Sequence, residues 1–169
     1  MEIFVVSSDR EVLQQAAAEG ANLLGEGVDK GVNAAVNLAL DMTSEACRWL
    51  IIPSDIPFLE ADDIRRVLEL GKRARVVIAP SREMSGTNLL LMGRDSRIPL
   101  SYDDDSFWNH LKNAARRGLR VAIYARMTAM LDLDSTPDLQ AALRMNVTNE
   151  TTRFLRRALR RKRKVGGRK

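Results

Sequence analysis

Short, nearly continuous apolar runs alternate along the chain with segments of helical periodicity. The runs are "EIFVVS", "RWLIIP", "RVVIAP", "NLLLMG" and "RVAIYA". Such runs are typical of strands buried on both faces, and their alternation with helices predicts a mostly parallel sheet covered on both sides. The sequence therefore predicts an α/β fold of three layers, similar to a Rossmann fold.

Helix signals lie between the apolar runs. Asp9 is a candidate N-cap for a helix that ends at Gly20, and Ala, Val and Leu recur at helical spacing over Val32–Met42. Further helices are expected over Glu60–Gly71, over Ser106–Arg117 and over Thr136–Arg144, the last with Pro137 in its first turn.

The short strand in "ANLLG" leads into the glycine-containing loop "GEGVDKG". This loop enters a helix, but it matches neither Gly-x-Gly-x-x-Gly nor a Walker A sequence. Dinucleotide-binding and P-loop proteins are therefore disfavoured.

Composition restricts the chain to one globular domain. With 169 residues, 45% of them hydrophobic, it can bury a sizeable core. Cys47 is the only cysteine, which excludes an intramolecular disulfide and a cysteine-rich zinc site. No apolar run approaches the ~20 residues of a membrane span, and no basic segment precedes one at the start. We expect a soluble, cytoplasmic protein.

Basic charge is concentrated at the C-terminus. Residues 151–169 hold ten of the 27 Lys and Arg residues and no acid, so residues 1–150 have 17 basic and 22 acidic side chains. We therefore divide the chain into a body, 1–150, and a basic tail, 151–169, with a short amphipathic helical pattern. A solvated helix and an attachment to nucleic acid or anionic lipid both remain open, although no base-reading pattern accompanies the charge.

Asp55 follows a predicted strand in "IIPSDIPFL". It suits a solvent-facing turn, but ligands of open α/β sheets bind beyond the carboxyl ends of the strands, where a carboxylate can hold a metal or a substrate. In "MLDLDSTPDL", Asp132 and Asp134 would share one face if the segment is extended, although Asp134 to Pro137 equally suit a helix N-cap. Together the three carboxylates would suit Mg²⁺.

Two further segments contain candidates for phosphate binding. "PSREMSGTNLLLM" has the flexible sequence Ser85-Gly86-Thr87, whose amides and hydroxyls can hold a phosphate or form an ordinary turn. In "SYDDDSFWNHL", Ser106 is placed at a helix N-cap and His110 lies one turn later on the same face. His110, the only histidine, could reach a phosphate or could simply be packed.

Taken together and in this order, "IIPSDIPFL", "PSREMSGTNLLL", "SYDDDSFWNHL" and "LDLDSTPDL" resemble the CofC family. These are 2-phospho-L-lactate guanylyltransferases with the MobA-like, glycosyltransferase-A-type nucleotidyltransferase fold, with relatives that use phosphoenolpyruvate or 3-phosphoglycerate. The resemblance implies transfer of GMP from GTP to a small phosphorylated carboxylic acid, with release of pyrophosphate, in the biosynthesis of coenzyme F-420.

The resemblance also implies roles for individual residues. Asp55, Asp132 and Asp134 match the family's catalytic metal carboxylates and would hold Mg²⁺. The other matched positions are Gly86, Thr87, Asn88 and Ser106 beside the acceptor, and Gly31 and Asn33 near the nucleotide. His110 is a further candidate near the acceptor phosphate, from its place one helical turn beyond Ser106 rather than from a family match.

Three departures from the family pattern accompany these matches. The family has an extra strand, basic loop and helix, on the order of forty residues, before the point where Met1 stands, so we expect an incomplete sheet. Asp103 to Asp105 replace a glycine-rich turn, and Glu83 and Met84 replace glycines. The alternative function is therefore a non-catalytic, N-terminally truncated module whose tail binds nucleic acid or anionic lipid; a homodimer would also suit an incomplete sheet.

Overall fold

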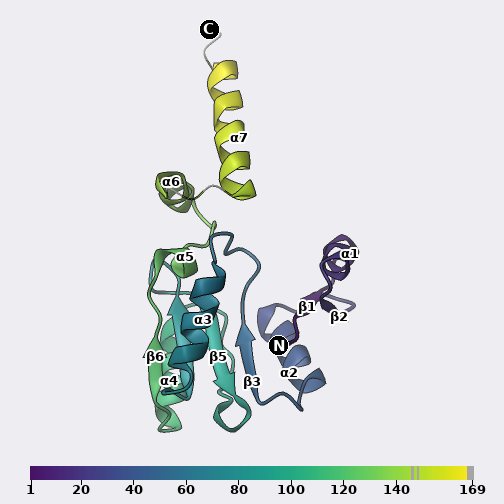
Figure 1. The fold of residues 1–169 in the computed structure, drawn as a ribbon, viewed down its shortest axis with the longest axis vertical. Coiled ribbons are helices and arrows are strands. Elements are labelled where there is room, and N and C mark those ends of the chain that lie inside the picture. The colour runs from purple at the N-terminus through teal and green to yellow at the C-terminus, as the bar shows by residue number, and fades with distance from the viewer. Residues whose placement is uncertain (146, 148, 167–169) are drawn as a thin grey trace.

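The computed structural model describes residues 1–145, 147 and 149–166, with side chains up to residue 158. Its strands are β1 (Phe4–Ser7), β2 (Asn22–Gly25), β3 (Arg48–Ile51), β4 (Val76–Pro80), β5 (Thr87–Gly93) and β6 (Val121–Ile123). Its helices are α1 (Arg10–Ala18), α2 (Val32–Met42), α3 (Ala61–Leu70), α4 (Ser106–Arg116), α5 (Met127–Met130), α6 (Thr136–Arg144) and α7 (Glu150–Gly166), with a 3-10 turn at Arg94–Ser96. The predicted strands and helices are confirmed to within a few residues (Figure 1); the short helix α5 was not expected.

The central sheet has the strand order β3-β5-β4-β6. Strands β4 and β6 pair in parallel, whereas β5 runs antiparallel to both β3 and β4. Three of the four strands thus run in one direction, as the sequence predicted, with β5 as the reversed strand. Helices α3 and α4 cover opposite faces (Figure 1), which confirms the three-layer α/β architecture.

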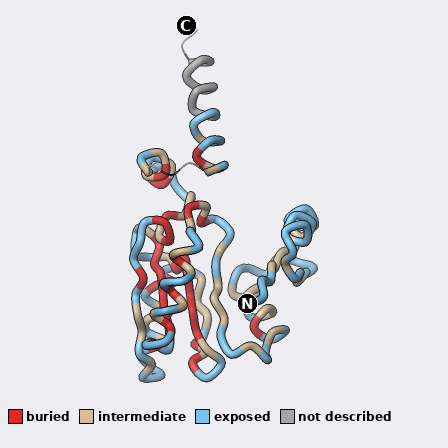
Figure 2. Tube along the Cα trace, viewed as in Figure 1, coloured by how far each residue is buried: buried red, intermediate tan, exposed pale blue. Residues whose placement is uncertain are grey.

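Alternating side chains of β4 and β5 build a core on each face of this sheet. Val76, Ile78, Leu90 and Met92 pack with Phe107 and Ala114 of α4 and Leu40 of α2. Val77, Ala79, Leu89 and Leu91 pack with Val67 of α3 and Ala129 of α5. Because side chains of a strand point alternately to its two faces, strands this apolar must be covered on both sides. Figure 2 shows these buried strands inside the larger part of the molecule, at the lower left.

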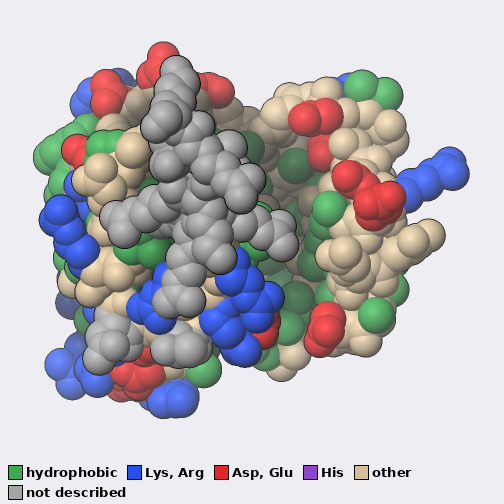
Figure 3. Space-filling model, turned by 90° about the horizontal axis from the view of Figure 1, so that it is seen from above, with side chains coloured by type: hydrophobic (Ala, Val, Ile, Leu, Met, Phe, Trp, Pro, Cys, Tyr) green, Lys and Arg blue, Asp and Glu red, His purple; other side chains and the backbone are tan. Residues whose placement is uncertain are grey.

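Strands β1 and β2 form a separate two-stranded parallel sheet. Its side chains are poorly covered: Leu23 is 43% exposed and Phe4 37%, Ile3 just before β1 is 60% exposed, and α1 has no buried residue. A hollow separates this N-terminal unit from the rest of the molecule (Figure 3). The protein exposes 11,229 Å², compared with about 8,300 Å² expected for a compact monomer of its mass. The strands are thus divided between two sheets, β1-β2 and β3-β5-β4-β6, rather than joined in one.

Helix α7 begins the basic tail and is anchored to the body at its first turns. Thr152 is fully buried, and Leu155 packs against the cluster of Phe58, Leu131 and Ala142. The Asn149 side chain donates a hydrogen bond to the carbonyl of Pro57 at 2.8 Å. The first turns of the tail thus contribute to the core beside the loop that carries Asp55, while Phe154 is 68% exposed.

Candidate functional site

One edge of the central sheet carries most of the predicted site residues. The carboxyl ends of β3, β4 and β6 lie at this edge, and so does the start of β5 because that strand is reversed. It is the upper edge of the sheet in Figure 1. The loop after β3 contains Asp55, the loop between β4 and β5 contains Gly86, and the segment after α5 contains Asp132 and Asp134.

The three predicted metal carboxylates influence one another electrostatically. Partial burial raises the pKa of Asp55, and the charge of Asp134 raises it further. Burial also raises the pKa of Asp132, and the neighbouring charges of Asp134, Asp138 and Asp55 act in the same direction. The structure therefore brings Asp55, Asp132 and Asp134 into one neighbourhood, although residues 131–134 are not the extended strand considered from the sequence.

This neighbourhood is not a closed metal cage. Within the described part of the chain, no three acidic, histidine or cysteine side chains are gathered tightly enough to hold a metal ion. The donor chemistry nevertheless fits, because carboxylate oxygens are the ligands that Mg²⁺ prefers and their mutual repulsion would be relieved by a cation.

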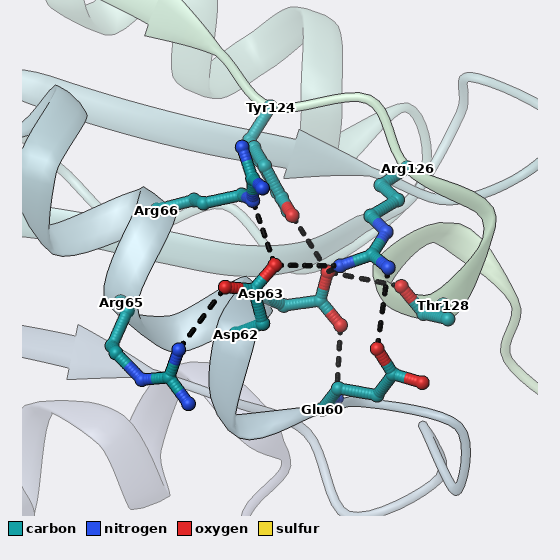
Figure 4. A network of polar contacts seen from close by, with 8 residues as sticks. All are labelled: Glu60, Asp62, Asp63, Arg65, Arg66, Tyr124, Arg126 and Thr128. Carbon is teal, nitrogen blue, oxygen red and sulfur yellow. Dashed lines mark hydrogen bonds and ion pairs between the residues drawn. The ribbon is translucent and has the colours of Figure 1, made fainter.

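A buried carboxylate network connects α3 to the segment that leads to Asp132 (Figure 4). Asp63, fully buried in the first turn of α3, accepts hydrogen bonds from the hydroxyls of Tyr124 and Thr128 at 2.6 and 2.9 Å. It also accepts from the Arg126 guanidinium at 3.2 Å and from the backbone N–H of Glu60 at 2.8 Å. Burial opposes ionisation of Asp63, but these donors outweigh it and lower its pKa. The network fixes the start of α3, after the Asp55 loop, against α5, which precedes Asp132.

Arg82 is a site residue whose partners the sequence did not reveal. Its Nε donates a hydrogen bond to the buried Asp138 carboxylate at 2.9 Å, 56 residues away in the chain. Burial opposes ionisation of Asp138, but hydrogen bonds from Ser135 and Arg82 lower its pKa overall. Hydrogen bonding to Asp138, together with the charges of Glu83, Asp138 and Asp132, raises the pKa of Arg82. A cation therefore stands beside the carboxylates, and only the tertiary fold places it there.

Ser135 and Asp138 also settle the alternative N-cap interpretation of this segment. Ser135 caps α6, its hydroxyl accepting from the Asp138 N–H at 3.4 Å, while the Asp138 carboxylate accepts from the Ser135 N–H at 2.9 Å. Capping is thus confirmed at Ser135, which leaves Asp134 exposed just before the helix.

Gly86 closes the loop between β4 and β5. Its N–H donates to the Ser81 hydroxyl at 2.9 Å, and its carbonyl accepts from the Ser81 N–H at 2.8 Å. A Cβ at position 86 would lie 3.2 Å from both the Cβ and the hydroxyl of Ser81, which is tighter than ordinary contact. Glycine thus permits the close turn that delivers Thr87 to the site edge.

Thr87, Ser106 and His110 form one buried hydrogen-bonded cluster. The Ser106 hydroxyl donates to the Thr87 hydroxyl at 3.2 Å, and His110 Nδ1 lies 3.0 Å from the same oxygen. His110 Nε2 accepts from the backbone N–H of Ser101 at 3.0 Å, so the proton of the neutral ring sits on Nδ1 and is donated to Thr87. Burial lowers the pKa of His110 to about 4.

The geometry corrects two details of the sequence interpretation. His110 is fully buried with both ring nitrogens used inside the protein, so it lies behind Thr87 rather than facing a ligand. The N-cap of α4 is Asp105, in a left-handed conformation with φ of 56°, and Ser106 is the first helical residue. The prediction of Ser106 as the cap was wrong by one position because the Ser106 hydroxyl is turned toward Thr87.

Gly31 and Asn33 lie at the start of α2, beside the segment that precedes α4. Gly31 adopts a positive φ of 85° at the N-cap. The Asn33 amide accepts from the backbone N–H of Tyr102 at 2.8 Å and donates to the Asp103 carboxylate at 3.0 Å. Asn33 therefore holds the acidic segment Asp103 to Asp105 in place, a partnership that sequence spacing did not suggest.

Asn88 has an unused donor. Its side chain is 4% exposed, and its Nδ2 has no hydrogen-bond partner within the described structure. A buried amide without a partner costs about 1–3 kcal/mol, so such groups are rare unless a ligand satisfies them. Asn88 Nδ2 is thus a buried donor without a partner next to Thr87 at the site edge.

Comparison with known proteins identifies the family. Residues 1–164 match the family described as guanylyl transferase CofC like. The chain belongs to this family.

Two curated relatives give the extent of the similarity. The chain is 37% identical over 138 residues to the 2-phospho-L-lactate guanylyltransferase of Methanothermobacter thermautotrophicus, covering 81% of this chain and 61% of that protein. It is 39% identical over 141 residues to the phosphoenolpyruvate guanylyltransferase of Rubrobacter xylanophilus, covering 81% and 68%. The chain thus spans about two thirds or less of the length of these CofC-like relatives.

Solved structures confirm the fold class. A Desulfovibrio desulfuricans protein assigned as a nucleotide-diphospho-sugar transferase superposes with a TM-score of 0.68 at 21% identity, covering 93% of this chain and 72% of that one. Molybdopterin-guanine dinucleotide biosynthesis protein A of Archaeoglobus fulgidus gives 0.50 at 14% identity, covering 82% and 75%. The nucleotidyltransferase-type α/β fold is therefore shown.

None of the described helices is both long and apolar enough to cross a membrane.

Proposed function

We propose that this CofC-like protein transfers GMP from GTP to a small phosphorylated carboxylic acid, releasing pyrophosphate, in coenzyme F-420 biosynthesis in the cytoplasm. The acceptor would be 2-phospho-L-lactate, phosphoenolpyruvate or 3-phosphoglycerate. The observation that carries the proposal is the shared neighbourhood of Asp55, Asp132 and Asp134 at the ligand-binding edge of the sheet, in a chain of this family.

Asp55, Asp132 and Asp134 would hold Mg²⁺, which supplies charge neutralisation at the transferring phosphate. The chain's other residues have binding and positioning roles. The Asn88 amide can donate to the acceptor, and the hydroxyls of Thr87 and Ser106 lie at the same edge, fixed from behind by His110. Arg82 supplies a positive charge beside the carboxylates. Phosphoryl-group transfer depends mainly on such positioning and neutralisation, so no protein nucleophile is required.

Pyrophosphate release tests the proposal directly. The chain is incubated with GTP, Mg²⁺ and each of the three acceptors in turn, and turnover with one acceptor is expected. Asp55→Asn should lower that turnover by at least about 100-fold, the scale of losing a contact to the metal. Glu19→Gln removes an equal charge from the exposed end of α1 and should leave turnover within twofold. Chelation with EDTA should abolish turnover, and added Mg²⁺ should restore it.

A second candidate function is a non-catalytic module. The divided sheet and the exposed arginines of the first turns of α7, Arg153, Arg156 and Arg157, favour it. Silence with all three acceptors, together with salt-dependent binding to RNA, DNA or anionic vesicles that disappears when residues 151–169 are deleted, would support this candidate over the enzyme. A homodimer is a separate possibility, in which a second copy of the chain would lie near the open edges of β1 and β3. Light scattering measures the molar mass in solution and so distinguishes a dimer from a monomer.

A further inference from the structure

A cavity lies at the edge of the central sheet opposite the carboxylates. It is lined by the start of β3, the turn from α3 into β4, the end of β5 and the residue before β6. This is the lower edge of the sheet in Figure 1. Its volume of about 480 Å³ falls within the range of about 300–1,000 Å³ common for small-molecule sites.

The lining is strongly basic. Six basic residues and one acidic residue, Asp95, are among the residues that line the cavity; the basic ones are Arg48, Lys72, Arg73, Arg75, Arg94 and Arg120. The body of the protein has more acids than bases, yet six of its 17 basic residues meet here. Such a concentration creates a local positive potential that attracts anions.

Most of this charge is not neutralised within the protein. Lys72 pairs with Glu69 at 2.5 Å, and Arg94 lies 3.9 Å from Glu45. The other four arginines have no ion pair within the described part of the chain. Four unpaired guanidinium groups are therefore available to a ligand.

The backbone holds these arginines together. The N–H groups of Arg75 and Val76 both donate to the carbonyl of Arg120, at 2.9 and 3.3 Å, so two like charges are placed on adjacent strands. Gly71 lets this turn approach β5 closely, since a Cβ there would lie 2.4 Å from Leu91 Cδ2. Like charges on neighbouring strands repel, and an anion between them would remove this penalty.

We propose that this cavity binds a small compound carrying several phosphate groups. Guanidinium groups match phosphate oxygens with paired hydrogen bonds, and several of them suit a triphosphate better than a single phosphate. No aromatic ring lines the cavity, so there is no stacking surface for a base and binding depends on the phosphates. Inorganic polyphosphate and the triphosphate of a nucleotide share this chemistry.

Isothermal titration with inorganic tripolyphosphate, without Mg²⁺, tests the site. Saturable binding of one equivalent is expected, and Arg73→Ala/Arg120→Ala should weaken it at least tenfold, about the effect of losing one charge-assisted hydrogen bond. The control Arg10→Ala/Arg116→Ala removes the same charge from exposed helix ends and should change affinity less than twofold. The amide signals of Gly71 and Gly93 should shift on binding.

No saturable binding, or equal weakening in both double variants, would overturn the proposal. Unchanged binding by Arg73→Ala/Arg120→Ala would also overturn it, because the basic tail would then be the binding element. A parallel titration with GTP identifies the source of the phosphates. Weakening by the same cavity variant would indicate a nucleoside polyphosphate, and GTP binding that the variant leaves unchanged would indicate inorganic polyphosphate as the ligand of this cavity.

Discussion

The stability of the protein should fall as pH decreases from 7 to 5 because of His110. The folded protein holds this imidazole neutral, with a pKa lowered by burial to about 4, whereas the unfolded chain protonates it near 6.5. Between these values the unfolded state binds the additional proton, so stability is complete above about pH 6.5 and is lost as pH falls. A shift of about 2.5 units corresponds to about 3 kcal/mol, of which about 2 kcal/mol is lost between pH 7 and pH 5.

Two measurements check this expectation. His110 is the only histidine, so its ring signals in an NMR titration are unambiguous and should remain those of the neutral Nδ1–H form down to about pH 4. Urea unfolding at pH 7, 6 and 5 gives the free energy of unfolding. His110→Gln removes the titrating group and should flatten the pH dependence in this range.

A titration midpoint near 6.5, or the same pH dependence in both proteins, would refute the reasoning. Either result would mean that His110 is open to solvent rather than bonded to Thr87 and Ser101. A cationic imidazole could then contact a ligand phosphate, which is the role that the sequence had left open.

Three further substitutions test the packing around the site. Asp63→Asn should lower the free energy of unfolding by about 3 kcal/mol, because it disturbs a buried carboxylate with four donors; urea unfolding measures this, and a loss below about 1 kcal/mol would contradict the network. Asp138→Asn should reduce the loss of stability below about pH 4, because the pKa of Asp138 is lowered in the fold and its contribution disappears on protonation; acid titrations of both proteins provide the comparison. Gly71→Ala should destabilise by about 1–3 kcal/mol, because the new Cβ would lie 2.4 Å from Leu91 Cδ2; an unchanged melting temperature would show that this turn has space.

The reversal of β5 shows what a local pattern leaves undecided. Apolar runs predicted strands at both "RVVIAP" and "NLLLMG", and both are buried on two faces. Burial on both faces favoured parallel pairing, yet only the six residues 81–86 join β4 to β5. A parallel connection requires a dozen or more residues, so the length of this loop was the signal that would have identified the antiparallel pair.

The candidate site was recovered in part for a similar reason. Asp55, Asp132 and Asp134 could be proposed because they follow apolar segments and match a family pattern. The Arg82–Asp138 pair and the Asn33 bridge to Asp103 could not, since their partners are 56 and 70 residues apart and neither spacing carries a signal. The burial of His110 was equally hidden, because helical spacing places it on the face of Ser106 without showing that the Ser101 segment covers the ring.

The sequence by itself determined the order of the main strands and helices, the cap at Asp9 and the family, because period, capping and motif are local properties of a chain. The tertiary structure alone decided the strand order β3-β5-β4-β6, the network around Asp63 and the basic cavity at the far edge. These depend on which distant segments meet, and that is set by packing of the whole core rather than by any one segment.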